Sequence, residues 1–217
     1  MSQNTSHAVM QQRHEAHDSL DDFPTPPWAT RALIKHVIDP AGVMGDSCWE
    51  PACNRGYMAR PLAEYFTKVH LSDIHDYGLG AFIGDFLFPT SFPNGRFDAP
   101  EWIITNPPFR LAEQFVSRAR QIASVGCAVI VRTSFLEGVG RYRDLFSQDP
   151  PSIIAQFSER VPMVRGRYDP DASTATSYAW LVWVNGFSGT GFVWIPPCRK
   201  HLQRIADSEF AIAEVEP

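Results

Sequence analysis

The segment 126–136, GCAVIVRTSFL, opens with an unbroken apolar run in which apolar and polar residues do not alternate. Strands with one face in water alternate, whereas strands covered on both faces are apolar throughout, as in the middle of a parallel sheet. The rest of the chain alternates strand-like pieces with helical patterns, which are clearest in the stretches 25–38 and 110–123. This order predicts an α/β domain with a mainly parallel sheet and helices on both faces.

Composition limits the number of domains and the class of protein. The chain has 217 residues, 44% of them hydrophobic and 20% charged, which suits one soluble domain with a sizeable core. We expect a flexible tail at 1–22, a single domain at 23–205 and an acidic tail at 206–217. The N-terminal stretch lacks an apolar signal segment and no run is long enough to cross a bilayer, so we expect a cytoplasmic protein without membrane contact.

Cysteine and histidine positions do not favour a metal site or covalent catalysis. The four cysteines form no CxxC pair and are interpreted as reduced thiols, and the N-terminal histidines have no carboxylate-rich turn beside them. Cys53 has no histidine that the sequence ties to it, and no serine lies in a GxSxG turn. We therefore predict no metal and look for chemistry elsewhere.

Charge is distributed unevenly along the chain. The net charge of −5 does not favour a nucleic-acid binder. However, residues 1–109 hold 7 basic and 13 acidic side chains, whereas residues 110–205 hold 12 basic and 7 acidic ones. The second segment could form a local positive face. Scattered, solvated arginines are the alternative, which charge alone favours.

Polar side chains follow four of the strand-like segments, namely Glu50, Asp73, Asp85 and Asn106. The carboxyl ends of parallel strands meet at one edge of a sheet, where α/β proteins bind their ligands. The turn after the first strand is EPACNRG, in which Gly56 allows close backbone approach and Asn54 tolerates a positive φ. Ahead of this strand, Thr25 could cap a helix whose first turn accepts the following prolines.

Two of these acids suit a nucleoside. Asp73 follows the first turn by about twenty residues, a spacing typical of an acid that binds ribose hydroxyls. No P-loop lysine follows the turn, so a nucleoside without a pyrophosphate would suit the site. Asp85 could accept a hydrogen bond from an adenine amino group while Phe86 packs on the ring. Taken singly, each acid is interpreted equally well as a helix cap or a turn residue.

The strand-like segment 101–105 stops at Asn106-Pro107-Pro108-Phe109. Two prolines cannot continue a central strand, because neither donates to the ladder. This rigid loop could hold a planar amino group: the Asn106 side-chain oxygen and the Pro107 carbonyl would each accept one N–H, and Phe109 would stack on the ring. The nitrogen lone pair would then be free to attack without a strong base. The alternative is a proline turn that only closes a strand.

NPPF after an apolar strand, EPACNRG upstream, and LSDIHD and IGDFL between them resemble S-adenosylmethionine-dependent amino methyltransferases, most closely the DNA adenine-N6 methyltransferases. FPTPPWATRAL resembles the TP segment that precedes the first glycine turn in that group. The match covers roughly residues 23–135. It implies a Rossmann-like class I methyltransferase fold, with a mostly parallel seven-stranded sheet and a C-terminal antiparallel hairpin.

The resemblance also implies a role for each matching residue. The cofactor S-adenosyl-L-methionine would be held by Thr25, Pro26, Glu50, Pro51, Ala52, Cys53, Asn54, Gly56, Asp73, Ile74, Asp85 and Phe86. Asn106, Pro107, Pro108 and Phe109 would carry the transfer. The chain departs from the family at Asn54, where glycine is usual, and it has no room for a large target-recognition domain.

Basic loops late in the chain could form a substrate face. Loops 136–150 and 160–176 would lie near the catalytic rim. Arginines suit phosphates and tyrosines suit base stacking, so the candidates for contact with DNA are Arg132, Arg141, Arg143, Arg165, Arg167 and Tyr168. Solvated loop charges with a few ion pairs within the loops are the alternative. A base within a duplex would have to be flipped into the site.

The main hypothesis is methyl transfer from S-adenosylmethionine to the N6 amino group of adenine in DNA. One alternative keeps the chemistry and changes the acceptor to RNA, cytosine N4 or a protein glutamine. Another is a protein that has lost catalysis and only binds cofactor or nucleic acid. The sequence leaves the recognised site and the oligomeric state open.

Overall fold

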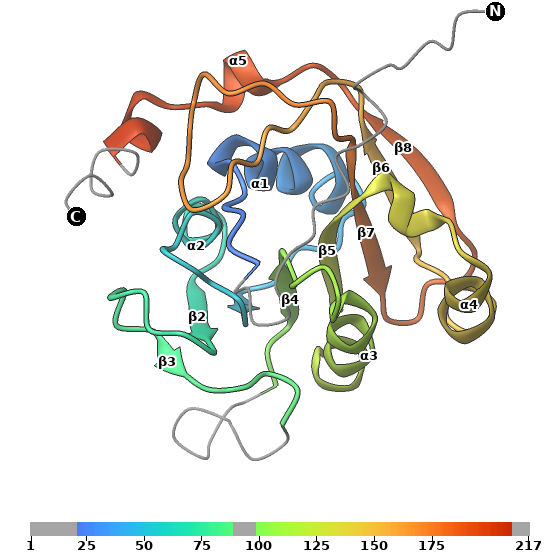
Figure 1. Ribbon diagram of the computed structural model, residues 1–217. Coiled ribbons are helices and arrows are strands. Elements are labelled where there is room, and N and C mark those ends of the chain that lie inside the picture. The colour runs from blue at the N-terminus through green and yellow to red at the C-terminus, as the bar shows by residue number, and fades with distance from the viewer. Residues whose placement is uncertain (1–20, 89–98, 210–217) are drawn as a thin grey trace, which may run out of the picture.

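The computed structural model describes residues 21–88 and 99–209 (Figure 1). The strands are β1 (Ser47–Glu50), β2 (Lys68–Asp73), β3 (Phe82–Ile83), β4 (Trp102–Thr105), β5 (Gly126–Arg132), β6 (Ile153–Phe157), β7 (Tyr178–Val184) and β8 (Gly191–Ile195). The α-helices are α1 (Pro27–Leu33), α2 (Ala59–Leu62), α3 (Ala112–Ile122), α4 (Val139–Arg141) and α5 (Arg199–Leu202). π-Helical turns extend α1 (η2, Ile34–Ile38) and α4 (η5, Tyr142–Phe146), and 3₁₀ turns are η4 (Thr133–Leu136) and η6 (Ile205–Ser208). None of the helices within these ranges is long and apolar enough to span a membrane.

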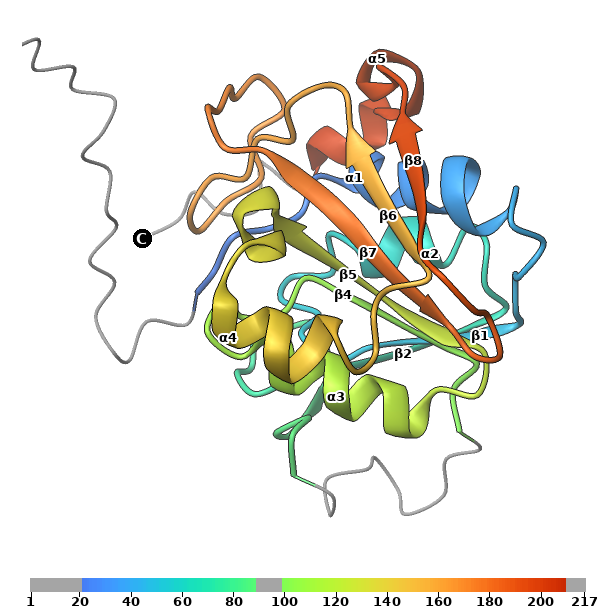
Figure 2. The same cartoon turned by 90° about the vertical axis from the view of Figure 1, so that its right-hand side faces the viewer.

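All the strands form one sheet in the order β3-β2-β1-β4-β5-β7-β6-β8 (Figure 2). Strand β7 runs antiparallel to both of its neighbours, and the other pairings are parallel. The predicted mainly parallel sheet with a late antiparallel hairpin is confirmed. The sheet has eight strands, one more than the seven expected, because β8 adds to the edge beside β6.

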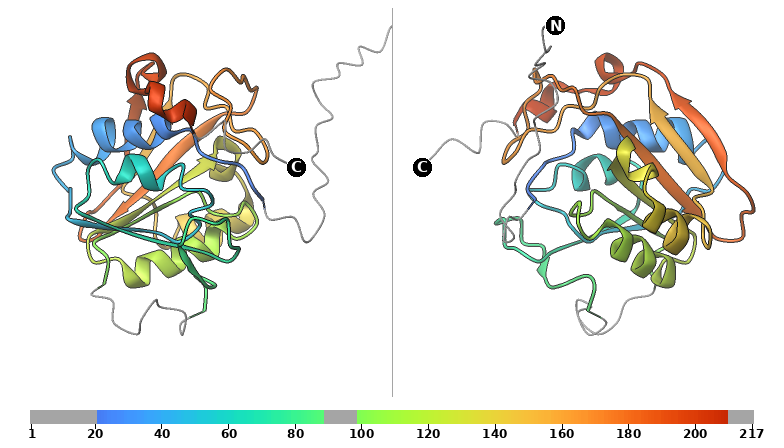
Figure 3. Two further views of the ribbon diagram at one scale, coloured as in Figure 1. Left: turned by 90° about the vertical axis from the view of Figure 1, so that its left-hand side faces the viewer. Right: turned by 45° about the vertical axis from the view of Figure 1, so that its right-hand side comes forward.

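Helices cover both faces of the sheet, as Figures 1 and 3 show. Each face of the sheet has its own hydrophobic core, and alternate residues of β4 point into one or the other. Trp102 and Ile104 pack with α1 and α2, whereas Ile103 packs with α3. In β5, Ala128 likewise lies in the core beside α1 and α2, and Val129 lies in the core beside α3. This two-sided burial explains why the β5 sequence shows no polar alternation.

Several helix boundaries differ from the sequence expectations. Helix α1 begins after Pro26 with no side-chain cap, so the predicted cap by Thr25 is wrong. Pro27 occupies the first helical position, where its missing N–H costs nothing. Helix α2 is short and contains Pro61, a residue that removes an intrahelical hydrogen bond. Near the C-terminal end of the described residues, α5 and η6 are two separate short helices.

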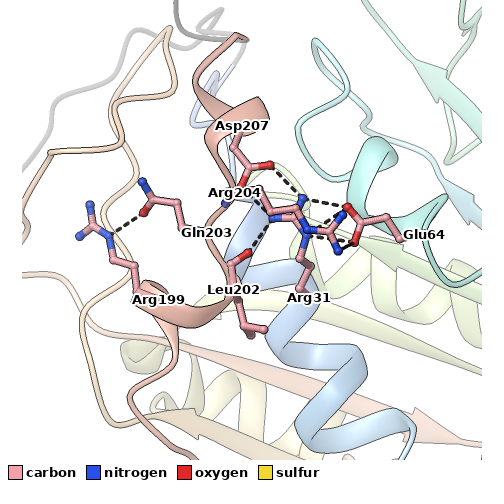
Figure 4. Close-up of polar contacts among 7 residues, drawn as sticks. All are labelled: Arg31, Glu64, Arg199, Leu202, Gln203, Arg204 and Asp207. Atoms are coloured by element: carbon pink, nitrogen blue, oxygen red, sulfur yellow. Dashed lines mark hydrogen bonds and ion pairs between the residues drawn. The ribbon is translucent and has the colours of Figure 1, made fainter.

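The packed part of the chain extends beyond 23–205 at both ends. Asp207 in η6 is buried and pairs with the buried guanidinium of Arg31 in α1, at 2.7 Å (Figure 4). Arg31 also pairs with Glu64 at 2.8 Å and donates to the Leu202 carbonyl. Burial acts to lower the pKa of Arg31, but hydrogen bonds to Asp207 and Glu64 outweigh it and raise that pKa. Residues 206–209 are therefore part of the fold, whereas the rest of the predicted acidic tail lies outside the described residues.

At the other end, Asp21 and Asp22 make specific contacts with the loops at the carboxyl ends of the strands. These two residues were predicted to belong to a flexible tail. Residues 1–20 lie outside the described part of the chain. The packed domain therefore includes at least 21–209, apart from the segment 89–98.

Candidate active site

A cavity with about 820 Å³ of empty space opens at the carboxyl ends of β1, β2 and β4. Twelve residues predicted from the sequence line it: Thr25, Glu50, Pro51, Ala52, Cys53, Asn54, Asp73, Ile74, Asp85, Phe86, Asn106 and Pro108. The fold therefore brings the first turn, both acids and the NPPF loop to one place. Pro26, Gly56, Pro107 and Phe109 do not line the cavity but lie in the same segments.

The turn after β1 has the backbone conformation that its sequence predicts. Asn54 has φ of 50° and Gly56 has φ of 84°. A Cβ on Gly56 would lie 3.2 Å from the side chain of Leu79, so the position favours glycine on two grounds. Asp73 Oδ2 accepts the backbone N–H of Asn54 at 2.9 Å, and its Oδ1 accepts that of His75 at 3.0 Å. The acid predicted to bind ribose thus fixes the turn through both of its carboxylate oxygens.

Glu50 is the most deeply buried acid of the cavity, with 2% of its surface exposed. Burial, and then the charge of Asp73, raise the pKa of Glu50 well above its ordinary value. Burial also raises the pKa of Asp73, against the effect of its backbone hydrogen bonds to His75 and Asn54. Two acids so close and so buried favour a cationic ligand, because positive charge beside them would stabilise the ionised forms.

The NPPF loop holds the Asn106 side chain in one orientation. Asn106 Nδ2 donates to the backbone carbonyl of Phe23 at 2.9 Å, so the amide oxygen faces away from that carbonyl. The backbone N–H of Phe109 donates to the Asp21 side chain. The centroid of the Phe109 ring lies 5.7 Å from that of the Phe23 ring. Pro107 is buried. The segment that precedes α1 therefore fixes the predicted transfer loop from its other side.

Three buried oxygens from cavity-lining residues lack hydrogen-bond partners within residues 21–88 and 99–209: Thr25 Oγ1, Glu50 Oε2 and Asn106 Oδ1. Buried polar groups in folded proteins nearly always have partners. Leaving such a group unsatisfied costs about 1–3 kcal/mol. The cavity is therefore built to receive a ligand with several hydrogen-bond donors.

Aromatic side chains form an apolar part of the cavity wall. Phe86 and Phe115 line the cavity with ring centroids 4.9 Å apart, and Phe86 meets Trp49 edge-on at 5.2 Å. Asp85 Oδ1 accepts the backbone N–H of Leu87 at 2.9 Å, which fixes the turn after β3. A planar heterocycle would fit between this apolar wall and the acids.

Two of the six predicted substrate residues adjoin the site, and one of them is buried. The Arg132 guanidinium lies over the Phe109 ring, 4.2 Å from its centroid, and its Nε has no hydrogen-bond partner within the described ranges. Tyr168 is buried against Tyr57, which lines the cavity, and burial raises its pKa to about 12. Tyr168 therefore packs close to the turn after β1 and does not present its ring at the surface.

The other four arginines lie farther out. Arg141 Nε donates to Glu113 at 2.9 Å, and its guanidinium stacks over Phe135. Arg143 pairs with the adjacent Asp144 and Arg167 with Asp169, both on the surface. Arg165 and Arg167 have exposed side chains, and the backbone N–H of Gly166 between them donates to the Asp22 carbonyl. Intrachain pairing of this kind is the alternative that the charge pattern left open.

The sequence did not reveal several residues of the cavity, namely Asp21, Phe23, Pro24, Tyr57, Met58, Tyr77, Gly84, Leu111 and Phe115. Most of them lie within a few residues of a predicted site residue, so proximity to the strand ends was the available signal. Asp21 was harder, because nothing in its composition separates it from the polar stretch before it. In the part of the chain that the structure describes, no group of three His, Cys, Asp or Glu side chains is placed to hold a metal ion.

Neither a family model nor a curated protein matches this sequence. Solved structures do match. A protein assigned as an RNA methyltransferase from Pyrococcus horikoshii gives a TM-score of 0.54 at 16% identity, over 75% of this chain and 87% of that one. The modification subunit of a protein assigned as a type I restriction enzyme, from Vibrio vulnificus, gives a TM-score of 0.53 at 15% identity, over 87% of this chain and 51% of that one. The M protein of the type I restriction enzyme EcoKI gives a TM-score of 0.53 at 12% identity, over 76% of this chain and 44% of that one.

At these identities the likeness concerns the fold. The chain has the Rossmann-like fold of methyltransferases, as the strand order and the reversed β7 indicate. It spans about half the length of the two modification proteins from restriction systems.

Proposed function

We propose that the protein transfers a methyl group from S-adenosylmethionine to the N6 amino group of adenine in DNA. The observation that carries this proposal is the orientation of Asn106. Its amide nitrogen is engaged by Phe23, and its buried oxygen, without a partner in the described residues, belongs to the cavity that Glu50 and Asp73 also line. An acceptor oxygen fixed in this way suits an amino group as the attacking atom.

The residues of the cavity fit the cofactor. When bound, S-adenosylmethionine supplies an electrophilic methyl group on a positively charged sulfur. Glu50 and the Thr25 hydroxyl would accept hydrogen bonds from its amino-acid end, which matches their unsatisfied buried oxygens. Asp73 would bind the ribose hydroxyls, and Asp85 with Phe86 would hold the adenine beside the apolar wall.

The NPPF loop would act on the acceptor. Asn106 Oδ1 and the Pro107 carbonyl each accept one N–H of the attacking amino group, which draws the nitrogen lone pair out of conjugation with the ring. The nitrogen becomes more acidic as it gains charge, so its proton is lost to water without a dedicated strong base. Rigid prolines and the Phe23 hydrogen bond keep this arrangement ready before the acceptor binds, which lowers the cost of orientation.

Nucleic acid is the favoured acceptor because the fold is shared with proteins named for DNA modification and for RNA methylation. Arg132 beside Phe109 adds a positive charge at the rim, suited to a phosphate. RNA, cytosine N4 and protein glutamine remain the competing acceptors, since they present the same amino chemistry to Asn106.

The test is to incubate the protein with methyl-labelled S-adenosylmethionine and separate pools of DNA, RNA and protein. We expect label in DNA, recovered as N6-methyladenine by mass spectrometry of nucleosides. Label only in RNA, cytosine or protein would overturn the DNA assignment and keep the chemistry. Failure of S-adenosylmethionine to bind, measured by calorimetry, would overturn the enzyme assignment altogether.

A further inference from the structure

Residues 21–25, here called the strap, connect three loops around the cavity. The side chain of Asp21 accepts the backbone N–H of Phe109 in the transfer loop. The Phe23 carbonyl accepts Asn106 Nδ2 from the same loop. The Asp22 carbonyl accepts the backbone N–H of Gly166 at 2.9 Å, in the loop predicted to contact substrate. The strap also lines the cavity through Asp21, Phe23, Pro24 and Thr25.

The Asp22 side chain ties the strap to the cofactor turn. Its carboxylate pairs with the Arg55 guanidinium at 3.0 Å and accepts Asn54 Nδ2 at 2.6 Å. Both charged side chains are largely shielded, with 16% exposure for Asp22 and 32% for Arg55. Shielding makes an ion pair stronger than one on the open surface. Arg55 further lies 4.9 Å from the centroid of the Tyr77 ring, which lines the cavity.

Two adjacent acids thus engage two different segments around the same cavity. Asp21 fixes the transfer loop, and Asp22 fixes the turn expected to hold the methionine end of the cofactor. A ligand between the turn and the loop would lie beneath the strap, because strap residues line the cavity together with both. Release of the Asp22 contacts would free the strap, which forms part of the wall of this cavity.

We propose that Asp21 and Asp22 are positioning residues with separate tasks: Asp22 retains the bound cofactor by closing the strap on the Asn54–Arg55 turn, and Asp21 sets the transfer loop. This inference rests on the proposed function. Because the Asp22 carbonyl also holds Gly166, closing of the strap on the cofactor organises the 160–176 loop for the acceptor.

The test measures dissociation of labelled S-adenosylmethionine from the full chain after dilution into excess unlabelled cofactor. We expect Asp22→Ala to raise the dissociation rate about tenfold. Asp22→Asn, which keeps an acceptor for Asn54 but loses the charge, should give an intermediate rate. The matched control is Asp144→Asn, which breaks an exposed pair with Arg143 and should leave the rate unchanged. Melting temperatures of all variants show whether each one is folded.

A double-mutant cycle isolates the ion pair from general loosening. If Asp22 acts through Arg55, then Asp22→Ala combined with Arg55→Ala should dissociate no faster than the more affected single variant. Wild-type dissociation rates in Asp22→Ala, or effects of the two substitutions that simply multiply, would overturn the inference while the proposed function stands. Absence of cofactor binding in the wild type would overturn both.

Asp21 has a different expected signature. Asp21→Ala should lower kcat about tenfold with little change in cofactor dissociation, because it acts on the Phe109 backbone. Asp21→Asn keeps an oxygen acceptor and should restore most of kcat. Equal loss in the two variants, or a loss confined to cofactor retention, would contradict the assigned task.

Discussion

The amide nitrogen of Asn106 donates to the main-chain carbonyl of Phe23, 83 residues earlier in the chain. This bond decides which end of the Asn106 amide is available to a ligand. With the nitrogen engaged, the oxygen is the available end, and it is buried without a partner among the described residues. The chemistry proposed for the NPPF loop therefore depends on a segment that precedes the first helix.

Glu50 should make the stability of the ligand-free protein depend on pH. Its pKa in the folded state is raised above its ordinary value of 4.5, mainly by burial, so the folded protein binds a proton that the unfolded chain releases. Stability is then lost as pH rises above about 4.5 and through the folded-state pKa. Glu50→Gln removes this loss and should raise Tm by about 3 °C at pH 8, or about 1 kcal/mol.

Thermal unfolding of wild type and Glu50→Gln at pH 5 and pH 8 checks this. The Tm of Glu50→Gln should exceed that of wild type by more at pH 8 than at pH 5. The same variant should bind S-adenosylmethionine more weakly. A constant difference between the two pH values would show that Glu50 is ionised throughout.

Asn54 should tolerate glycine better than alanine. Its φ of 50° is costly for residues with a Cβ, by roughly 1–2 kcal/mol, although asparagine is less affected. Asn54→Ala should therefore lower the free energy of unfolding by about 1 kcal/mol or more, and Asn54→Gly should stay closer to wild type. Urea denaturation of both variants measures this, and an equal loss in the two would show that the lost Asp22 contact dominates.

The Arg31 cluster should carry much of the stability of the N-terminal helix. Arg31→Met leaves the buried Asp207 carboxylate without its cation and should cost about 3–5 kcal/mol. Arg31→Met combined with Asp207→Leu removes both charges and should recover part of the loss. Denaturant unfolding gives the comparison, with Arg143→Met on the exposed surface as the control expected to be silent. A loss in Arg31→Met as small as in the control would contradict the account.

Much of the fold followed from the sequence. The two-sided burial of β5 and the polar residues at the ends of β1, β2 and β4 predicted a parallel sheet with a site at one edge, and both are present. These features depend on local patterns of apolar and polar residues, which the sequence displays directly.

The sequence could not reveal contacts between segments far apart in the chain. Asp21 and Asp207 both lie in polar stretches and were predicted to be in tails, yet each meets a partner distant in sequence, Phe109 and Arg31 respectively. A charged residue in a polar stretch is usually solvated, so only the tertiary fold distinguishes these two. Asn106 itself could be identified from the sequence. The orientation of its amide could not, because it depends on a hydrogen bond to Phe23.

Arg132 should contribute to nucleic-acid binding as a phosphate contact. It stacks on Phe109 at the rim of the site and forms no ion pair within residues 21–88 and 99–209. Arg132→Gln should weaken DNA binding severalfold and reduce the slope of log affinity against log salt by about 1. Lys68→Gln, at the start of β2 and so at the opposite edge of the sheet, is the control. An unchanged slope in Arg132→Gln would exclude a phosphate contact.

The central claim is that Asn106 activates an amino group for methyl transfer. The most direct measurement compares wild type and Asn106→Ala for N6-methyladenine formed in DNA, with S-adenosylmethionine affinity measured on the same preparations. The account predicts a fall in kcat of about 10²-fold or more, with cofactor affinity nearly unchanged. Undiminished methylation by Asn106→Ala would contradict it.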